Sequence, residues 1–259
     1  MASSIVVASG KGGVGKTSLA VNLGLTLARQ GRRTILFDAD FGMANAHILL
    51  GANPGRYVMD AIRGEASMAD VLCDAAFGMK FISGGSAINN LLNLSDLERH
   101  KIIQSFNNIK KRPEYMLIDV GAGAEASSMS FMASSDKIII VLVGEPTSFM
   151  DAYAFIKALN LEKNLERVSI VVNMAKGSDD ARSSFNSFQK IVAQFLDIEL
   201  SFLGWLPSSQ VISNSILSRK PFVLNSKVNT HLNARLTEIA NNIDNAPSCK
   251  TNSIRFFDK

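Results

Sequence analysis

A short glycine-rich loop near the N-terminus carries the residue types that phosphate binding requires. It lies between an apolar stretch at residues 5–8 and a helical pattern that starts at Leu19. Gly10, Gly15, Lys16 and Thr17 satisfy the spacing G-x-x-x-x-G-K-[ST], which is specific when a strand precedes it and a helix follows. The sequence therefore predicts a phosphate-binding loop.

The residues of this loop have different tasks. Its glycines let the backbone curl so that successive N–H groups, together with the positive end of the next helix, face phosphate oxygens. We expect Lys16 to contact the β- and γ-phosphates of ATP and the Thr17 hydroxyl to bind Mg²⁺. The predicted nucleotide contacts within the loop are Gly12, Gly13, Val14, Gly15, Lys16, Thr17 and Ser18.

Three aspartates end strand candidates further along the chain. Asp119 closes the apolar run 115–119, where a carboxylate can hold Mg²⁺ through its water shell. Asp38 and Asp40 follow the run 34–37, and one could support Mg²⁺ while the other orients the water that attacks the γ-phosphate. Solvated acids without a common role are the alternative, which their placement beside a phosphate loop disfavours.

The elements that must position these residues are strands and helices in alternation. This order predicts an α/β fold, a doubly wound, mainly parallel sheet with helices on both faces. We expect strands at residues 5–8, 34–37, 80–83, 115–119, 137–143, 168–172 and 202–206. We expect helices at 19–30, 41–51, 57–63, 97–109, 149–159, 182–195, 210–218 and 229–244, with Ser95 and Thr147 as caps and Leu97, Ile102, Ile103, Phe106 and Ile109 buried.

The composition suits one globular domain with a short tail. The 259 residues are 47% hydrophobic and 19% charged, which excludes a disordered chain. We assign residues 1–245 to the catalytic domain and 246–259 to the tail. The net charge of +4 is mild, and the basic run 110–112 is interpreted as a solvated helix end, which makes nucleic acid an unfavoured partner. Two distant cysteines, and no signal peptide or membrane-spanning run, predict a cytoplasmic protein.

A second lysine in the loop indicates which class of phosphate-binding proteins the sequence resembles. Lys11 begins the stretch Lys-Gly-Gly-Val-Gly-Lys-Thr, which resembles the deviant Walker A box of the MinD/ParA class of ATPases. Residues 38–45 with 49–51 resemble switch I of the FlhG (FleN) branch of that class, 117–123 resemble its switch II, and 145–153 resemble the loop and helix that follow. The resemblance covers about residues 4–240.

The resemblance implies roles for individual residues. Lys11 would reach the phosphates of a partner subunit, Lys16 would hold the chain's own phosphates, and Asp40 would position water. Thr17, Asp38 and Asp119 form the implied metal set. Asn173 and Pro207 would hold the adenine base, and Glu145 would contact the ligand of the partner subunit.

The sequence differs from the usual pattern of the FlhG (FleN) branch at two positions and in its C-terminal tail. Val120 stands where threonine is usual, which removes a hydroxyl from switch II, and His47 replaces an acid and is interpreted as a surface residue without a role. Residues 252–259 resemble the start of a membrane-targeting amphipathic helix, with Ile254, Phe256 and Phe257 as apolar anchors. A tail that frays or packs against the body is an equal alternative.

The implied activity is that of a switch. ATP and Mg²⁺ would bridge two subunits into a homodimer, and slow hydrolysis would separate them. The output would be control of the number and placement of polar flagella. The implied partners are a flagellar signal-recognition-type GTPase, FlhF-like, and a flagellar transcriptional activator, with weak peripheral binding to the inner face of the cell membrane.

Three alternatives stay open. A MinD-type selector of the cell-division site would need a stronger membrane helix than this tail offers. A ParA-type DNA-partitioning ATPase is disfavoured by the modest positive charge. A scaffold that binds nucleotide without turnover is disfavoured because Lys16, Asp40 and Asp119 are all present.

Overall fold

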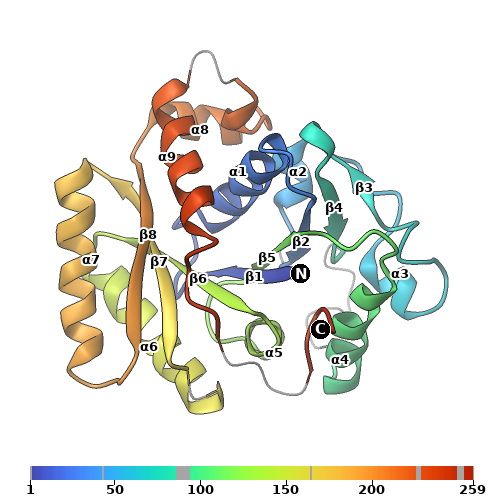
Figure 1. Cartoon of the computed structure of the whole chain (residues 1–259), viewed down its shortest axis with the longest axis horizontal. Coiled ribbons are helices and arrows are strands. Elements are labelled where there is room, and N and C mark those ends of the chain that lie inside the picture. The colour runs from blue at the N-terminus through green and yellow to red at the C-terminus, as the bar shows by residue number, and fades with distance from the viewer. Residues whose placement is uncertain are drawn as a thin grey trace.

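A sheet of eight strands runs through the middle of the computed structural model, which describes residues 2–42, 44–85, 94–163, 165–225, 229–249 and 254–258 (Figure 1). The strand order is β3-β4-β2-β5-β1-β6-β7-β8, and only β3 is antiparallel to its neighbour. The strands are β1 Ser3–Ala8, β2 Thr34–Ala39, β3 Cys73–Asp74, β4 Lys80–Ser83, β5 Tyr115–Val120, β6 Lys137–Val143, β7 Arg167–Ala175 and β8 Glu199–Pro207.

Helices cover both faces of this sheet (Figure 1). The central strands are therefore buried on both sides, which is why they appear in the sequence as continuous apolar runs rather than alternating ones. The helices are α1 Lys16–Arg29, α2 Ala46–Leu50, α3 Val58–Ile62, α4 Asp96–Ser105, α5 Ala126–Ala133, α6 Pro146–Lys163, α7 Ser178–Ala193, α8 Gln210–Leu217 and α9 Thr230–Asn242. Short 3₁₀ turns lie at η1 Ala76–Gly78, η2 Phe106–Asn108 and η3 Phe222–Leu224.

The core has two parts, one on each face of the sheet. One part packs α4, α5, α6 and α7 against the sheet, and the other packs α1 and α9. The predicted fold class is confirmed, and all seven expected strands are present. The short edge strand β3 and the helix α5 were not predicted.

Several predicted helix features are wrong. Helix α6 begins at Pro146, a residue suited to the first helical position, so Thr147 does not cap it. Helix α2 covers only the second half of the expected 41–51 segment, because the Ala46 N–H donates 3.0 Å to the Asp38 carboxylate rather than to a helical carbonyl four residues earlier. Leu97 is 62% exposed rather than buried. Ser95 does cap α4, in a capping box with Glu98.

The C-terminal residues pack into the core. Phe256 is fully buried, with its ring 5.4 Å from Phe106 and 6.0 Å from Phe131, and Phe257 is buried beside it. The Asp258 N–H donates 3.0 Å to the Asn107 side chain. The alternative of a tail packed against the body therefore describes this structure, whose C-terminus lies beside α4 (Figure 1).

The remaining tail predictions concern Asn252, Ser253 and Lys259, which lie outside the described residues. None of the helices in the described ranges is both long and apolar enough to cross a membrane.

Candidate nucleotide site

The glycine-rich loop connects β1 to α1 and leaves its backbone donors available. Gly13 and Gly15 have positive φ values of 79° and 86°, a conformation that glycine adopts without steric penalty. Helix α1 starts at Lys16 with no side-chain cap. Within the described chain, no N–H group of residues 12–18 donates a hydrogen bond. The loop therefore presents a row of free donors at a helix N-terminus, as phosphate binding requires.

Close packing fixes the path of the loop. A Cβ atom at Gly10 would lie 2.3 Å from the backbone carbon of Asp151 in α6, and one at Gly15 would lie 2.3 Å from Nδ2 of Asn173. The same Nδ2 donates a 2.8 Å hydrogen bond to the Val14 carbonyl. Asn173, two residues before the end of β7, thus holds the loop in place, a role that the sequence did not indicate. Its contact to adenine stays a prediction.

Lys16 and Asp119 form a buried ion pair at the base of the loop. The ammonium nitrogen lies 2.6 Å from Oδ1 of Asp119, and the side chains are 8% and 1% exposed. The second carboxylate oxygen, Oδ2, is buried and has no hydrogen-bond partner in the described part of the chain. A magnesium ion that keeps most of its water shell needs such an oxygen acceptor, so Asp119 fits the predicted metal position.

Asp38 lies beside Asp119, since the two residues are paired in the register of β2 and β5. Its carboxylate accepts hydrogen bonds from the N–H groups of Ala46, at 3.0 Å, and Asp40, at 3.2 Å. Burial, and then the negative charge of Asp119, raise the pKa of Asp38 to about 8. Asp38 therefore shapes the loop that carries Asp40, and a nearby cation would favour its charged form.

The two predicted switch segments approach each other at Gly121. A Cβ atom at this residue would lie 3.7 Å from Oδ1 of Asp40 and 3.4 Å from Oε2 of Glu125. The Ser128 hydroxyl donates 3.3 Å to the Gly121 carbonyl. Glu125 and Ser128 belong to this site although the sequence did not single them out, because helix α5, which Glu125 precedes, was not recognised.

The remaining predicted residues lie around the same edge of the sheet. Thr17 is half-buried in the first turn of α1, and Lys11 is exposed on the loop. Glu145 is exposed directly before α6. Pro207 ends β8 and is paired with Ala175 of β7, two residues beyond Asn173. The structure brings Lys16, Asp38 and Asp119 into one cluster and leaves Lys11 and Glu145 on the surface.

The structure shows the surroundings of Val120 and His47, the two residues that differ from the usual switch sequences. The Val120 side chain is fully buried in the core, where a hydroxyl would need a partner. His47 is half-buried, and its Nδ1 atom is buried without a hydrogen-bond partner among the described residues. His47 therefore lies only partly at the surface, and the interpretation that it has no role stays a prediction.

These features define a P-loop nucleotide-binding protein. They are a parallel sheet, a glycine-rich loop between its first strand and first helix, a lysine in that loop and an aspartate at a strand end. The family model "ParA: NUBPL iron-transfer P-loop NTPase" matches residues 1–244. The chain belongs to the ParA/MinD family of P-loop NTPases, whose members include ATPases.

The similar proteins point to two groups within this family. The antiactivator FleN of Pseudomonas aeruginosa is 36% identical over 216 residues, covering 83% of this chain and 77% of the relative. The flagellum site-determining protein YlxH of Helicobacter pylori is 30% identical over 217 residues, covering 83% and 73%. MinD in the Aquifex aeolicus MinC:MinD complex has a TM-score of 0.76 at 25% identity, covering 94% and 96%. The resemblance predicted from the motifs is confirmed.

Proposed function

We propose that the protein is an ATP-dependent dimerisation switch with slow, partner-stimulated hydrolysis that regulates the number and placement of polar flagella. The observation that supports a dimerisation switch is the different burial of two lysines in one loop. Lys16 is buried against Asp119, while Lys11 is exposed five residues earlier. An exposed lysine beside the phosphate donors is suited to reach a ligand held by a second copy of the chain.

The residues of the nucleotide site would have different roles in hydrolysis. The free N–H groups of residues 12–18 would bind phosphate oxygens, and Lys16 would turn from Asp119 to the phosphates. Asp119 and Thr17 would hold Mg²⁺, with Asp38 in support. Bound Mg²⁺ would neutralise charge that develops on the phosphates. Asp40 would orient the attacking water.

Residues at the rim would complete the ligand contacts across the dimer. Lys11 of the partner copy would supply the neutralising positive charge, and Glu145 would touch the ligand of the other subunit. Asn173 and Pro207 would flank the adenine base. These assignments are supported by their common position at the carboxyl edge of the sheet, where open α/β folds bind ligands.

The flagellar output is supported by the two flagellar relatives, FleN and YlxH. We propose a flagellar signal-recognition-type GTPase and a flagellar transcriptional activator as partners. Weak peripheral membrane binding through the tail would require residues 254–258 to leave the core, since Phe256 and Phe257 cannot be buried in both places.

Light scattering tests the switch directly. The wild-type chain should be monomeric with ADP and dimeric with a non-hydrolysed ATP analogue, and Lys11→Ala should bind the analogue but dimerise poorly. Lys157→Ala, which removes an exposed lysine from α6, is the matched control and should dimerise normally. A wild-type chain that stays monomeric with bound analogue would rule out the nucleotide-bridged dimer.

A role in selecting the cell-division site is the second candidate. It is favoured by the septum site-determining protein MinD of Synechocystis, which is 34% identical over 232 residues, covering 86% of this chain and 83% of that relative. Deleting the gene in its own host separates the two functions. The flagellar proposal predicts cells with an altered number of flagella and normal division, whereas the second candidate predicts misplaced septa.

A further inference from the structure

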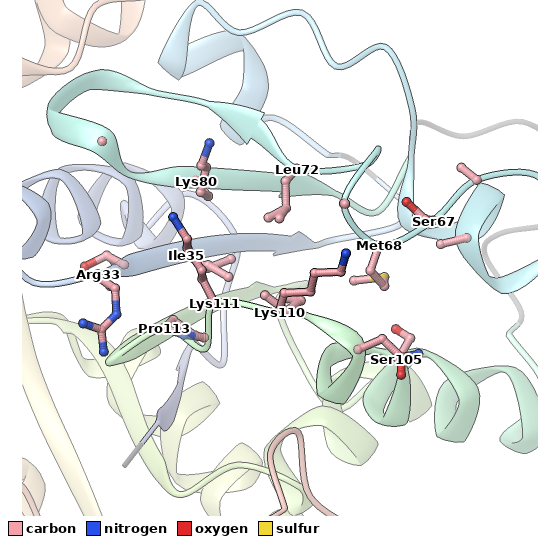
Figure 2. A pocket seen from close by; sticks show the side chains of 17 residues that line it. Arg33, Ile35, Ser67, Met68, Leu72, Lys80, Ser105, Lys110, Lys111 and Pro113 are labelled. Carbon is pink, nitrogen blue, oxygen red and sulfur yellow. The ribbon is translucent and has the colours of Figure 1, made fainter.

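A cavity of about 760 Å³ lies at the far end of β2 from the nucleotide loop. Its wall is formed by the starts of β2 and β4, the segment between α3 and β3, and the segment between η2 and β5 (Figure 2). Ile35 lines it, and Asp38 lies three residues further along the same strand, or roughly 10 Å at the rise of a β-strand. The cavity is therefore separate from the nucleotide site.

The inside of the cavity is apolar. Ile35, Met68, Leu72 and Ile109 line it, together with several alanines whose small side chains leave the space open. Ile35, Met68 and Ile109 are buried. Sites for small molecules typically have volumes of roughly 300–1,000 Å³, mostly apolar walls and a few polar groups that fix orientation. This cavity has the size and the lining of such a site.

Basic side chains are the only charged residues among those that line the cavity in the described part of the chain. Arg33, Lys80, Lys110 and Lys111 line it, and no aspartate or glutamate is among the described residues that do so. The whole chain has 27 lysines and arginines against 23 acids, so a lining with four basic residues is locally enriched in positive charge, even with Asp74 and Glu114 paired to two of them just outside it. An anionic group is the ligand chemistry that complements this lining.

Two of the four cations are free to meet such a group. Lys80 pairs with Asp74 at 2.5 Å, and Arg33 lies 3.8 Å from Glu114. Lys110 and Lys111 are exposed and have no acidic partner in the described ranges. In Figure 2 the Lys110 side chain extends toward the part of the cavity lined by Met68.

We propose that this cavity binds a single-chain amphiphile with an anionic head group, a carboxylate or a phosphate. The alkyl chain packs against Ile35, Met68 and Ile109, and the head group pairs with the Lys110 ammonium group, while Lys111, whose side chain extends in another direction, adds positive charge to the lining (Figure 2). The sequence alone indicates that the basic run 110–112 is a solvated helix end. In this proposal the run, through Lys110, contacts the head group of a bound ligand.

The proposal predicts how affinity depends on the length of the ligand's alkyl chain and on the charge of the two lysines. Each buried methylene group should tighten binding about fourfold until the cavity is filled. Because Lys110 and Lys111 are exposed, removing both should weaken binding of a carboxylate only about fivefold to tenfold.

The experiment is calorimetric titration of the full chain with octanoate, decanoate and dodecanoate, below the concentrations at which they form micelles. Dodecyl phosphate, dodecanol and dodecyltrimethylammonium test the head group. We expect one site per chain, affinity that rises with chain length, and tighter binding of the two anionic heads than of the neutral or cationic one. Absence of binding, or equal binding of all heads, would overturn the proposal.

Three variants locate the site. Ala66→Leu places a larger side chain in the cavity and should reduce the affinity for dodecanoate at least tenfold while leaving the lysines in place. Lys110→Ala with Lys111→Ala should weaken the anionic ligands and leave dodecanol unchanged. Lys157→Ala with Lys190→Ala makes the same change in net charge on α6 and α7 and should have no effect.

Two further outcomes would refute the proposal. Binding that none of the cavity variants changes would place the ligand elsewhere. Binding to phosphatidylglycerol vesicles without binding of free dodecanoate or dodecyl phosphate would assign the positive charge to a membrane surface instead. Circular dichroism of each variant, together with its nucleotide affinity, distinguishes loss of the cavity from loss of the fold.

Discussion

The ammonium group of Lys16 and the carboxylate of Asp119 lie 2.6 Å apart in an almost fully buried ion pair. The pair joins the loop after β1 to the end of β5, and it links the residue expected to hold phosphate with the residue expected to hold Mg²⁺. The two groups neutralise each other in a place where a lone charge would be costly.

Removing one member of this pair should therefore destabilise the chain strongly. Replacing Lys16 by methionine leaves Asp119 buried and unpaired, and we expect the free energy of unfolding without nucleotide to fall by about 3–5 kcal/mol. Urea denaturation of wild type and Lys16→Met measures this. The added stability that Mg-ATP gives the wild type through binding to the folded state should also be absent from the variant.

The exposed pair between Arg167 and Glu199 is the matched control. Its atoms lie 2.9 Å apart, but the side chains are 54% and 63% exposed, so water screens their attraction. Glu199→Gln should change the free energy of unfolding by less than about 1 kcal/mol. Equal stability of Lys16→Met and wild type would show that the Lys16–Asp119 pair is not closed in solution.

Of two glycines in the same loop, one should lose stability on gaining a methyl group and the other should not. A Cβ atom at Gly10 would lie 2.3 Å from the α6 backbone, whereas no atom lies within 4 Å of one at Gly12. Gly10→Ala should therefore lower the free energy of unfolding by about 1–3 kcal/mol, as overpacking does. Gly12→Ala should stay within about 0.5 kcal/mol of wild type.

Thermal unfolding of the two variants checks this contrast, and nucleotide titration adds a second measurement. Gly12→Ala keeps the fold, so any loss of ATP affinity in it reports on the phosphate contacts alone. Equal melting temperatures of Gly10→Ala and wild type would contradict the close approach of the loop to α6.

The loop and the strand-end acids were predictable because their signals are local. Gly10, Gly15 and Lys16 lie within seven positions of one another, and Asp119 directly ends an apolar run. A parallel sheet then brings the strand ends together without further information. The sequence was therefore sufficient for the phosphate loop, for a mainly parallel sheet with seven of its strands, and for the position of Asp119 at a strand end.

The errors arise where distant contacts decide the structure. Helix α2 begins only at Ala46 because that residue's N–H is held by Asp38, eight positions earlier and on another element. Phe256 is buried because Phe37 of β2, Phe106 of η2 and Phe131 of α5 form an aromatic cluster that it joins. The contact of Asn173 with the Val14 carbonyl spans 159 positions. No local pattern contains such information.

Tyr115 gives a prediction for alkaline pH. Its hydroxyl donates to the Asp244 carboxylate, and burial followed by that hydrogen bond and charge raises the pKa of Tyr115 from 10 to about 12. Between these pH values the unfolded chain loses this proton while the folded chain keeps it, so the free energy of unfolding should fall as the pH rises through the window.

The absorbance of tyrosinate measures this shift. Subtracting the titration of Tyr115→Phe from that of the wild type should leave a single transition near pH 12. Asp244→Asn removes the neighbouring charge and should move the transition to lower pH. A difference curve centred near pH 10 would contradict the contact between Tyr115 and Asp244.

The buried tail gives the last prediction, since Phe256 is as enclosed as any core residue. Phe256→Ala should lower the free energy of unfolding by about 3–5 kcal/mol, because the truncation leaves a cavity between η2 and α5. Phe195→Ala, at a ring that is 68% exposed, should change it by about 0.5 kcal/mol or less. Urea denaturation of the two variants compares them. If both lose the same small amount, the tail is released in solution, and its apolar side chains are then free to meet a membrane.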